Sequence, residues 1–373
     1  MTQKRLALHV FSTFGKGGPQ IRATQVLSRM GPGWRHQILA MDGHTEAASL
    51  LPGDIEVEVA SVPKRLGFLA SMRSFVSRLG REQPDLLLTY NWGAIEAVVG
   101  ARRMRFPRLV HHEDGFGREE WERRLRRRNW IRRIALRKVP AVVVPSQNLE
   151  TIATREWKVA ADRVHHLVNG VDCQHFHPAE AAASARPFTV GTVGGLRAEK
   201  DHAMLLGALA ATPEHTVRAL LVGDGAERQR LEQLAARLGV ADRVTFAGAT
   251  EDPAPFYREM DAFVLSSRTE QMPLSLLEAM ASGLPVASTD VGDVRRMLPE
   301  GSRDGIVEAG DATALAGVFE ALAGDAERRC REGQANRQRC LEDYELGACL
   351  DRFVAVYEQV ANQGAAAGAQ PDR

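Results

Sequence analysis

The sequence predicts an α/β protein with two doubly wound domains. Short runs that are apolar on both faces alternate with helix-length segments along the 373 residues, which is the pattern of parallel strands in βαβ units. The chain is longer than one compact core usually supports. A segment rich in Ala, Pro and Ser at 177–187 divides the strand candidates into two sets, so we interpret it as the linker.

The strand candidates follow one another at the spacing expected of βαβ units. In the first half they are 5–11, 36–41, 55–60, 85–90, 108–112 and 141–145. In the second half they are 188–193, 217–223, 243–248, 261–267 and 284–288. We therefore expect domains at 1–178 and 188–340, and a disordered tail at 362–373, where large apolar residues are few.

Composition excludes several classes of protein. The net charge of +1 predicts no overall attraction to nucleic acid. The four cysteines have neither metal-site spacing nor a disulfide pattern, which favours a reduced, cytoplasmic setting. The first residues lack the apolar stretch of a signal peptide, and no run is long enough to span a bilayer. We expect a soluble protein, or one bound peripherally to a membrane.

The stretch TEQMPLSLLEAMASG at 269–283 places two carboxylates in an otherwise apolar context. Glu270 falls in a loop after the strand candidate 261–267, and Pro273 suits the first position of a helix that ends near Gly283. Ligands of open α/β sheets bind at the carboxyl ends of strands, and a helix N-terminus attracts anions. The stretch therefore predicts a phosphate site.

Glu278 lies inside this predicted helix among core-type residues. An unpaired carboxylate would be costly to bury there, so a polar partner is required. The hydroxyls of a ribose or sugar would satisfy it. Two other interpretations remain: Glu278 faces solvent, or it pairs with an arginine such as Arg295.

These motifs together resemble the family 4 glycosyltransferases. The E-x7-E stretch continues into LLEAMASGLPV, and the segments FGKGGPQ, LVHHEDG, VVVPSQNLE, LVNGVDCQHFHP and GTVGGLRAEKDH occur in the family's order, from about residue 5 to 357. The resemblance implies the GT-B fold, a retaining hexosyltransferase activity, a nucleotide-sugar donor on the second domain and an acceptor on the first. It also implies a helix at 341–361 that crosses back to the first domain.

The resemblance assigns roles around the donor. Glu270 would contact hydroxyls of the transferred sugar, and Glu278 would contact the ribose. Lys200 would neutralise the diphosphate as charge develops on it. Backbone N–H groups near Pro273, Leu274 and Ser275 would cradle the phosphates, although proline itself has no N–H.

Other positions match the family less closely. Gly17 and Gly18 belong to a glycine-rich loop that faces the donor in relatives, but Gln20 stands where many members have a glutamate. Gly195 stands where the family usually has an arginine, and Arg197 is the nearest substitute.

The segment LVHHEDG supplies the remaining site candidates. Relatives often place a histidine here, beside the donor sugar, where a neutral imidazole can hydrogen-bond a hydroxyl. His111 is the first choice, together with Glu270 and Lys200 as catalytic residues. His112 and Asp114 are tentative candidates for the acceptor or sugar region, because adjacent residues of a strand point to opposite faces.

The segment 118–139 is rich in arginine and contains tryptophan and isoleucine. One interpretation is a solvated helix face. The other is an interfacial helix attracted to an anionic membrane surface, which would suit a lipid-linked or envelope polysaccharide acceptor. Nucleic-acid binding is disfavoured because no recognised aromatic or helix-turn-helix motif accompanies the charge.

Missing motifs narrow the chemistry. The sequence has no D-x-D motif and no G-x-x-x-x-G-K-[ST] loop, so we expect neither a metal-bound diphosphate nor a P-loop, and no cofactor beyond the nucleotide-sugar substrate. A catalytically silent nucleotide-sugar-binding subunit and a sugar epimerase on the same fold remain alternatives. An NAD-dependent oxidoreductase would need a dinucleotide fingerprint that is absent.

Overall fold

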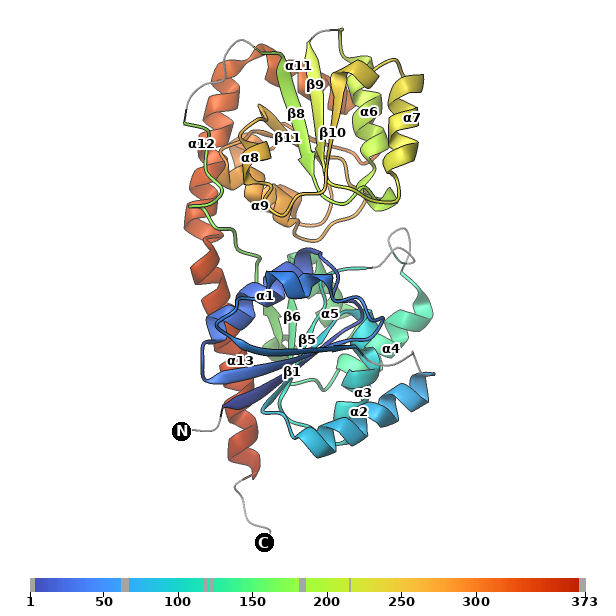
Figure 1. Ribbon diagram of the computed structural model, residues 1–373, viewed down its shortest axis with the longest axis vertical. Coiled ribbons are helices and arrows are strands. Elements are labelled where there is room, and N and C mark those ends of the chain that lie inside the picture. Colours follow the sequence, from blue (N-terminus) through green and yellow to red (C-terminus); the bar gives the residue numbers. More distant parts are fainter. Residues whose placement is uncertain are drawn as a thin grey trace. The chain divides into compact units, whose positions relative to one another are not determined.

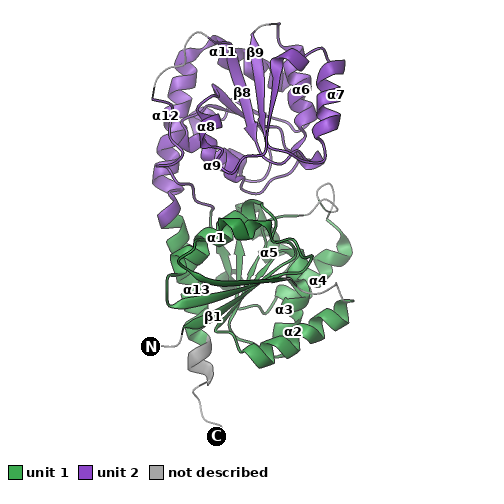
Figure 2. Cartoon of the chain, in the orientation of Figure 1, with its two compact units in different colours: residues 1–168, 348–373 green, residues 169–347 purple. Residues whose placement is uncertain are grey.

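The computed structural model describes residues 4–61, 67–116, 120, 124–180, 186–214 and 216–368. The chain forms two compact units (Figures 1 and 2). Unit 1 comprises Met1–Val168 and Ala348–Arg373, and unit 2 comprises Asn169–Gly347. The predicted domain boundary is displaced accordingly: residues 169–178, which we assigned to the first domain, belong to unit 2.

Unit 1 is built on a parallel sheet with strand order β3-β2-β1-β4-β5-β6-β7. Its strands are β1 (Arg5–Phe11), β2 (Trp34–Ala40), β3 (Glu56–Ser61), β4 (Leu86–Tyr90), β5 (Leu109–His112), β6 (Ala141–Val144) and β7 (Val164–His166). The first six correspond to predicted strands. The central strands are buried along their whole length, which is why they read as continuous apolar runs.

Helices cover this sheet on both faces. They are α1 (Gly18–Met30), α2 (Phe68–Glu82), α3 (Ile95–Arg103), α4 (Arg126–Leu136), α5 (Gln147–Arg155) and α13 (Leu346–Gly368), with short 3₁₀ turns η1 (Glu46–Leu50), η2 (Trp92–Ala94) and η3 (Ala161–Arg163). Apolar side chains of α2 to α5 form one core with the sheet, including Phe75, Val98, Leu136 and Ile152.

Helix α13 is fastened to unit 1 by polar contacts at several points. Glu358 accepts hydrogen bonds from Arg5 at 2.8 and 2.6 Å and from the indole of Trp34 at 2.9 Å. Arg29 of α1 pairs with Asp351 at 2.6 Å. The helix continues to Gly368, so the first residues of the predicted tail at 362–373 are helical, and residues 369–373 lie outside the described part of the chain.

Unit 2 repeats the design with strand order β10-β9-β8-β11-β12-β13, again parallel. Its strands are β8 (Phe188–Val193), β9 (Val217–Val222), β10 (Val244–Gly248), β11 (Ala262–Leu265), β12 (Val286–Thr289) and β13 (Ile306–Val307). The first five correspond to predicted strands. Both sheets reverse their strand order beside the first strand, between β1 and β4 and between β8 and β11, which is where open α/β sheets bind ligands.

The helices of unit 2 enclose its core. They are α6 (His202–Ala211), α7 (Arg228–Arg237), α8 (Ala254–Tyr257), α9 (Leu274–Ala281), α10 (Val294–Met297), α11 (Ala312–Gly324) and α12 (Ala326–Asp343), with 3₁₀ turns η4 (Ala198–Lys200), η5 (Ala241–Arg243) and η6 (Glu300–Ser302). Leucines of α6 and α11 pack against β8, β9 and β11. This core fixes the strand ends from which the site loops leave.

Candidate functional site

Two loops of unit 2 meet at the point where its strand order reverses. One follows β8 and ends in η4 with Lys200, and the other follows β11. Ser266 Oγ donates to the Lys200 carbonyl at 2.9 Å, and the Arg268 N–H donates to the Glu199 carbonyl at 2.9 Å. These contacts hold the two loops together at the carboxyl ends of neighbouring strands.

Lys200 and Glu270 form an ion pair between these loops. Lys200 Nζ lies 2.5 Å from Glu270 Oε1, and Ser267 Oγ donates to the same oxygen at 2.8 Å. The side chains are 20 % and 13 % exposed, so the pair is neither sealed in the core nor fully solvated. The sequence pattern predicted that both residues belong to one site, and the structure brings them into contact.

The backbone around Glu270 is fixed by its neighbours. Gly292 has a φ of 54°, and a Cβ there would lie 2.4 Å from the Glu270 carbonyl, so only glycine permits this close approach. The Asp293 N–H donates to Gln271 at 3.0 Å, and Asn169 Nδ2 donates to Met272 at 2.8 Å. The loop that carries Glu270 is therefore pre-organised.

Glu278 is satisfied by a tyrosine that the sequence pattern did not reveal. Tyr257 Oη, at the end of α8, donates to Glu278 Oε2 at 2.7 Å. Burial raises the pKa of Glu278, and the tyrosine hydrogen bond opposes that shift. Arg295, the alternative partner, instead pairs with Asp290 at 2.6 Å. Glu278 is therefore a half-buried carboxylate held in place by a neutral donor.

Helix α9 begins directly after the Glu270 loop. The helix starts at Leu274, one residue later than predicted, and Pro273 is its N-cap. The first N–H groups of a helix have no intrahelical partner, so those of Leu274 and Ser275 stand at an end that favours anions. Pro273 contributes no N–H.

Arg197 lies against the position where the family usually has an arginine. A Cβ at Gly195 would be 3.1 Å from Arg197 Nε and 3.6 Å from its Nη2. The Arg197 side chain is 58 % exposed and lies 3.5 Å from Glu199. Its guanidinium thus lies beside the Cα of Gly195, in the same unit as Lys200.

The glycine-rich loop of unit 1 is braced from within. Helix α1 begins at Gly18, and Gly17 has an extended φ of −162° that any residue could adopt. Gln20 is buried and its Nε2 donates to the Thr13 carbonyl at 3.0 Å. The glutamine that stands in place of the family's glutamate therefore stabilises the loop.

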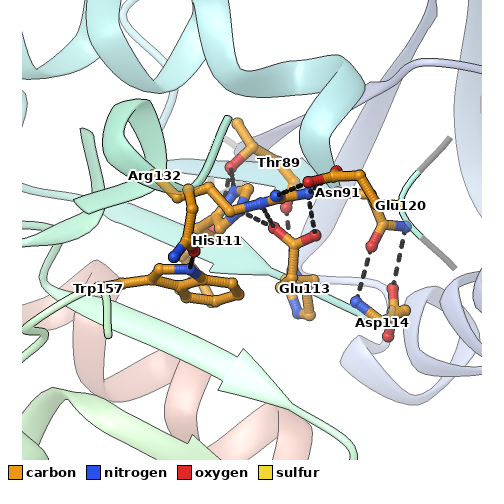
Figure 3. A network of polar contacts seen from close by, with 11 residues as sticks. Thr89, Asn91, His111, Glu113, Asp114, Glu120, Arg132 and Trp157 are labelled. Atoms are coloured by element: carbon orange, nitrogen blue, oxygen red, sulfur yellow. Dashed lines mark hydrogen bonds and ion pairs between the residues drawn. The ribbon is translucent and has the colours of Figure 1, made fainter. Parts of the chain in front are cut away.

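His111 lies in a buried network rather than at an accessible surface (Figure 3). Its Nδ1 is 2.9 Å from Thr89 Oγ1, and its Nε2 is 3.4 Å from Glu113 Oε2. Its side chain is 0 % exposed, so this arrangement gives no support to a direct contact with a donor sugar. That role stays a prediction.

Arg132 organises the same network from α4 (Figure 3). Its guanidinium donates to Glu113 at 3.3 Å and to Glu120 at 3.1 Å, with two hydrogen bonds to each carboxylate. Burial alone would raise the pKa of Glu113, but the charge of Arg132 and the contact with His111 lower it. One cation thus binds two carboxylates beneath α4.

His112 and Asp114 are engaged in the same way on the other side of β5. His112 Nε2 is 2.7 Å from Tyr357 Oη of α13, and burial lowers the pKa of this histidine, which stays neutral. Asp114 pairs with Arg22 of α1 at 2.6 Å, and its N–H donates to Asn91 at 2.7 Å. These contacts position the end of β5, and a role in the sugar region stays a prediction.

The described residues contain neither a metal-binding cluster nor a membrane-spanning helix. No group of three or more His, Cys, Asp or Glu side chains there is arranged to hold a metal ion. Over the same ranges, no helix has the length and apolar character needed to cross a membrane.

Sequence models of two glycosyltransferase domains match this chain. Residues 25–175 match "Glycosyltransferase Family 4", and residues 187–325 match "Glycosyl transferases group 1". Together the two matches span more than half of the chain. The protein belongs to the family 4 glycosyltransferases. The second match contains the site residues Lys200, Tyr257, Glu270 and Glu278.

Curated members of this family are similar over part of their length. The lipopolysaccharide core biosynthesis glycosyltransferase LpsE of Rhizobium meliloti is 33 % identical over 165 residues, which are 44 % of this chain and 48 % of LpsE. The alpha-D-kanosaminyltransferase of Streptomyces kanamyceticus is 27 % identical, over 62 % of this chain and 63 % of that enzyme. The matches thus span from about half to less than two thirds of these relatives.

Solved structures share the whole fold. The Anabaena protein Alr3699/HepE, crystallised with UDP and glucose, superposes with a TM-score of 0.82 at 19 % identity, covering 95 % of this chain and 100 % of that one. WaaG, a glycosyltransferase involved in lipopolysaccharide biosynthesis, gives 0.75 at 17 % identity, covering 94 % and 99 %. The family 4 chain described here therefore has the predicted GT-B fold.

Proposed function

We propose that this family 4 protein is a retaining, metal-independent glycosyltransferase that binds its nucleotide-sugar donor on unit 2. The contact of Lys200 and Ser267 with Glu270 is the observation that carries the proposal. It supplies a cation and a carboxylate, both partly accessible, next to a helix N-terminus. A nucleoside diphosphate sugar needs these groups: a cation for the phosphates and an acceptor for sugar hydroxyls.

The ion pair suggests how the donor enters. Lys200 pairs with Glu270 at 2.5 Å. A diphosphate would compete for Lys200, and Glu270 would keep its Ser267 hydrogen bond while it accepts hydroxyls of the sugar. As the glycosidic bond breaks, negative charge accumulates on the leaving diphosphate, where Lys200 and the first N–H groups of α9 would stabilise it.

Glu278 would hold the ribose. Its Oε2 accepts from Tyr257, and a carboxylate has further lone pairs for hydroxyl donors. For retention of configuration, we favour front-side attack in which the departing phosphate takes the proton of the acceptor hydroxyl. Such a step asks the protein for charge stabilisation and alignment, not for a covalent nucleophile.

The acceptor is proposed from the relatives. LpsE and the 28 % identical mannosyltransferase LpsB of Rhizobium meliloti are both named for lipopolysaccharide core biosynthesis. We propose that this protein glycosylates a lipid-linked or envelope polysaccharide precursor on the cytoplasmic side of a membrane, with the acceptor bound by unit 1.

The two alternatives can be told apart from a transferase by their products. A transferase liberates a nucleoside diphosphate only in proportion to sugar transferred or hydrolysed. An epimerase on this fold changes the sugar without an acceptor, and a silent subunit binds the donor without turnover. Gln20 and Gly195, the two departures from the family pattern, are the residues that keep the silent subunit under consideration.

The test is to incubate the protein with UDP-, GDP-, ADP- and TDP-sugars and an extract of bacterial lipid-linked glycans. Release of one nucleoside diphosphate together with a labelled glycolipid is the expected result, and it should be lost in Lys200→Met but kept in Arg295→Gln. Arg295 is a suitable control because it pairs with Asp290 at 2.6 Å in the same unit and its side chain is 52 % exposed. Sugar conversion without acceptor, or binding without turnover, would replace the proposal by one of the alternatives.

A further inference from the structure

Helix α4 carries apolar and cationic side chains together on its outward face. Trp130 is 63 % exposed and Ile134 is 48 % exposed, and Arg126, Arg133 and Arg137 are exposed beside them. At 3.6 residues per turn, these five positions fall within an arc of about 100°. The helix therefore presents one continuous stripe to its surroundings, which we call the α4 stripe.

The opposite side of α4 is fixed to unit 1. Ala135 and Leu136 belong to the core of the sheet, and Arg132 is held by Glu113 and Glu120. Its guanidinium also lies 5.5 Å from the ring centre of Trp157. The stripe is thus displayed by a rigid helix, and its apolar side chains cannot turn inward.

The arginines near this helix fall into two groups. Arg124 pairs with Glu156 at 2.7 Å and Arg128 with Glu120 at 3.5 Å. Those of the α4 stripe have no carboxylate within 4.0 Å among the residues that the structure describes. Arg124, Arg128 and Arg132 are thus balanced by carboxylates within the fold, and charge on the stripe is available to a partner.

The chemistry of the stripe selects the partner. Exposed tryptophan and isoleucine favour a partly apolar environment, and unpaired arginines favour phosphate. A headgroup layer of anionic lipid offers both, since it accepts an indole and an aliphatic chain at the depth where phosphates meet guanidinium groups. A nucleic-acid backbone offers the phosphates but leaves Ile134 exposed to water.

We propose that the α4 stripe is a docking surface for an anionic lipid bilayer. Trp130 and Ile134 enter the interfacial layer, and the flanking arginines bind lipid phosphates. Association is parallel to the surface and reversible, as expected of a short interfacial helix. This contact is independent of the donor site, so it can be measured without any sugar nucleotide.

The direct test is binding of the full chain to sonicated vesicles of phosphatidylcholine and phosphatidylglycerol in equal parts, compared with pure phosphatidylcholine. Binding to the anionic vesicles alone, weakened by added salt, is expected. Brominated phosphatidylcholine in the anionic vesicles should quench tryptophan fluorescence, and Trp130→Phe should remove most of that quenching. Absence of anionic vesicle binding would overturn the proposal.

Paired variants separate charge from insertion. The double variant Arg133→Gln with Arg137→Gln should weaken vesicle binding about thirtyfold, because it removes the binding contribution of two cations near the membrane surface. Trp130→Ala with Ile134→Ala should reduce binding comparably, while quenching disappears. The control is Arg237→Gln with Leu238→Ala at the end of α7, which removes one cation and one apolar side chain that is 39 % exposed, and it should bind like wild type.

Three results would each count against the α4 stripe. Unchanged vesicle binding by both stripe variants would place the contact elsewhere. Equal loss in the α7 control would indicate attraction by overall charge. Tighter binding to a single-stranded oligonucleotide than to the vesicles at equal phosphate concentration would assign the surface to nucleic acid. Circular dichroism of each variant distinguishes these results from loss of fold.

Discussion

Replacement of Arg132 by methionine should destabilise unit 1 strongly. The guanidinium is fully buried and donates four hydrogen bonds, at 3.1 to 3.3 Å, to Glu113 and Glu120, which are also buried. Methionine fills a similar volume but leaves Glu113 without the Arg132 cation and Glu120 with the longer Arg128 contact at 3.5 Å. Removing one partner of a buried ion pair costs about 3 to 5 kcal/mol of folding free energy.

The chain provides its own reporter and control for this measurement. All five tryptophans belong to unit 1, so urea unfolding followed by tryptophan fluorescence reports on that unit alone. Arg124→Gln breaks the ion pair with Glu156. The side chains of this pair are 36 % and 33 % exposed, so the variant should lose at most about 1 kcal/mol of folding free energy. Glu113→Gln with Glu120→Gln in the Arg132→Met background should recover much of the loss.

The pH dependence of this variant has a defined sign. In the wild type, Arg132 lowers the pKa of Glu113 against the effect of burial, so the carboxylate stabilises the fold above its unfolded pKa of about 4.3. Without the cation, burial raises that pKa, and the deficit should grow as the pH increases from about 5 to 8. A loss no larger than that of Arg124→Gln, or one independent of pH, would refute the reasoning.

Three further predictions concern other described groups. Burial lowers the pKa of His36 and His202 to about 4. Each should therefore contribute about 3 kcal/mol to the free energy of unfolding above pH ~6.5, and this contribution is lost as the pH falls toward 4. A urea midpoint unchanged between these pH values would contradict this. Tyr257→Phe removes the donor to Glu278 and should weaken nucleotide-sugar binding about tenfold in calorimetry, and an unchanged affinity would mean that the ribose lies elsewhere. Arg197→Ala should weaken the same binding about fivefold, and a Gly195→Arg substitution in that variant should restore it if the two arginines are equivalent.

The strands were predictable because burial on both faces leaves a clear sequence signal. The predicted runs 85–90 and 261–267 contain uninterrupted apolar stretches at 86–88 and 262–265, and the structure contains strands there. Strands β7 and β13 were missed because three and two residues are too few to establish a pattern, and β7 is partly polar. Both lie at a sheet edge, where burial is incomplete.

The residues of the proposed donor site were predictable in part. Glu270 and Lys200 follow neighbouring parallel strands, so the topology alone brings them to one edge of the sheet. Tyr257 was missed because its contact with Glu278 depends on how α8 packs against α9, which no local pattern encodes. Ser267 carried a weak signal, as a hydroxyl at the end of an apolar strand.

The histidines of β5 show what strand alternation alone leaves open. Alternation along a strand correctly places His111 and His112 on opposite faces, but it suggested that one face is open to a ligand. Strand β5 lies inside the sheet and both of its histidines are buried. His111 meets the Arg132 network, and His112 is covered by Tyr357 of α13. The covering helix lies 245 positions away in the chain from His112, beyond the reach of any sequence window.

Calorimetric titration with UDP-, GDP-, ADP- and TDP-sugars tests the central claim most directly. We predict that donors of one base bind to the wild type, that Lys200→Met and Glu278→Gln each weaken this binding at least about tenfold, and that Arg295→Gln leaves it unchanged. Binding that persists equally in all three variants would contradict a donor site built on Lys200, Glu270 and Glu278.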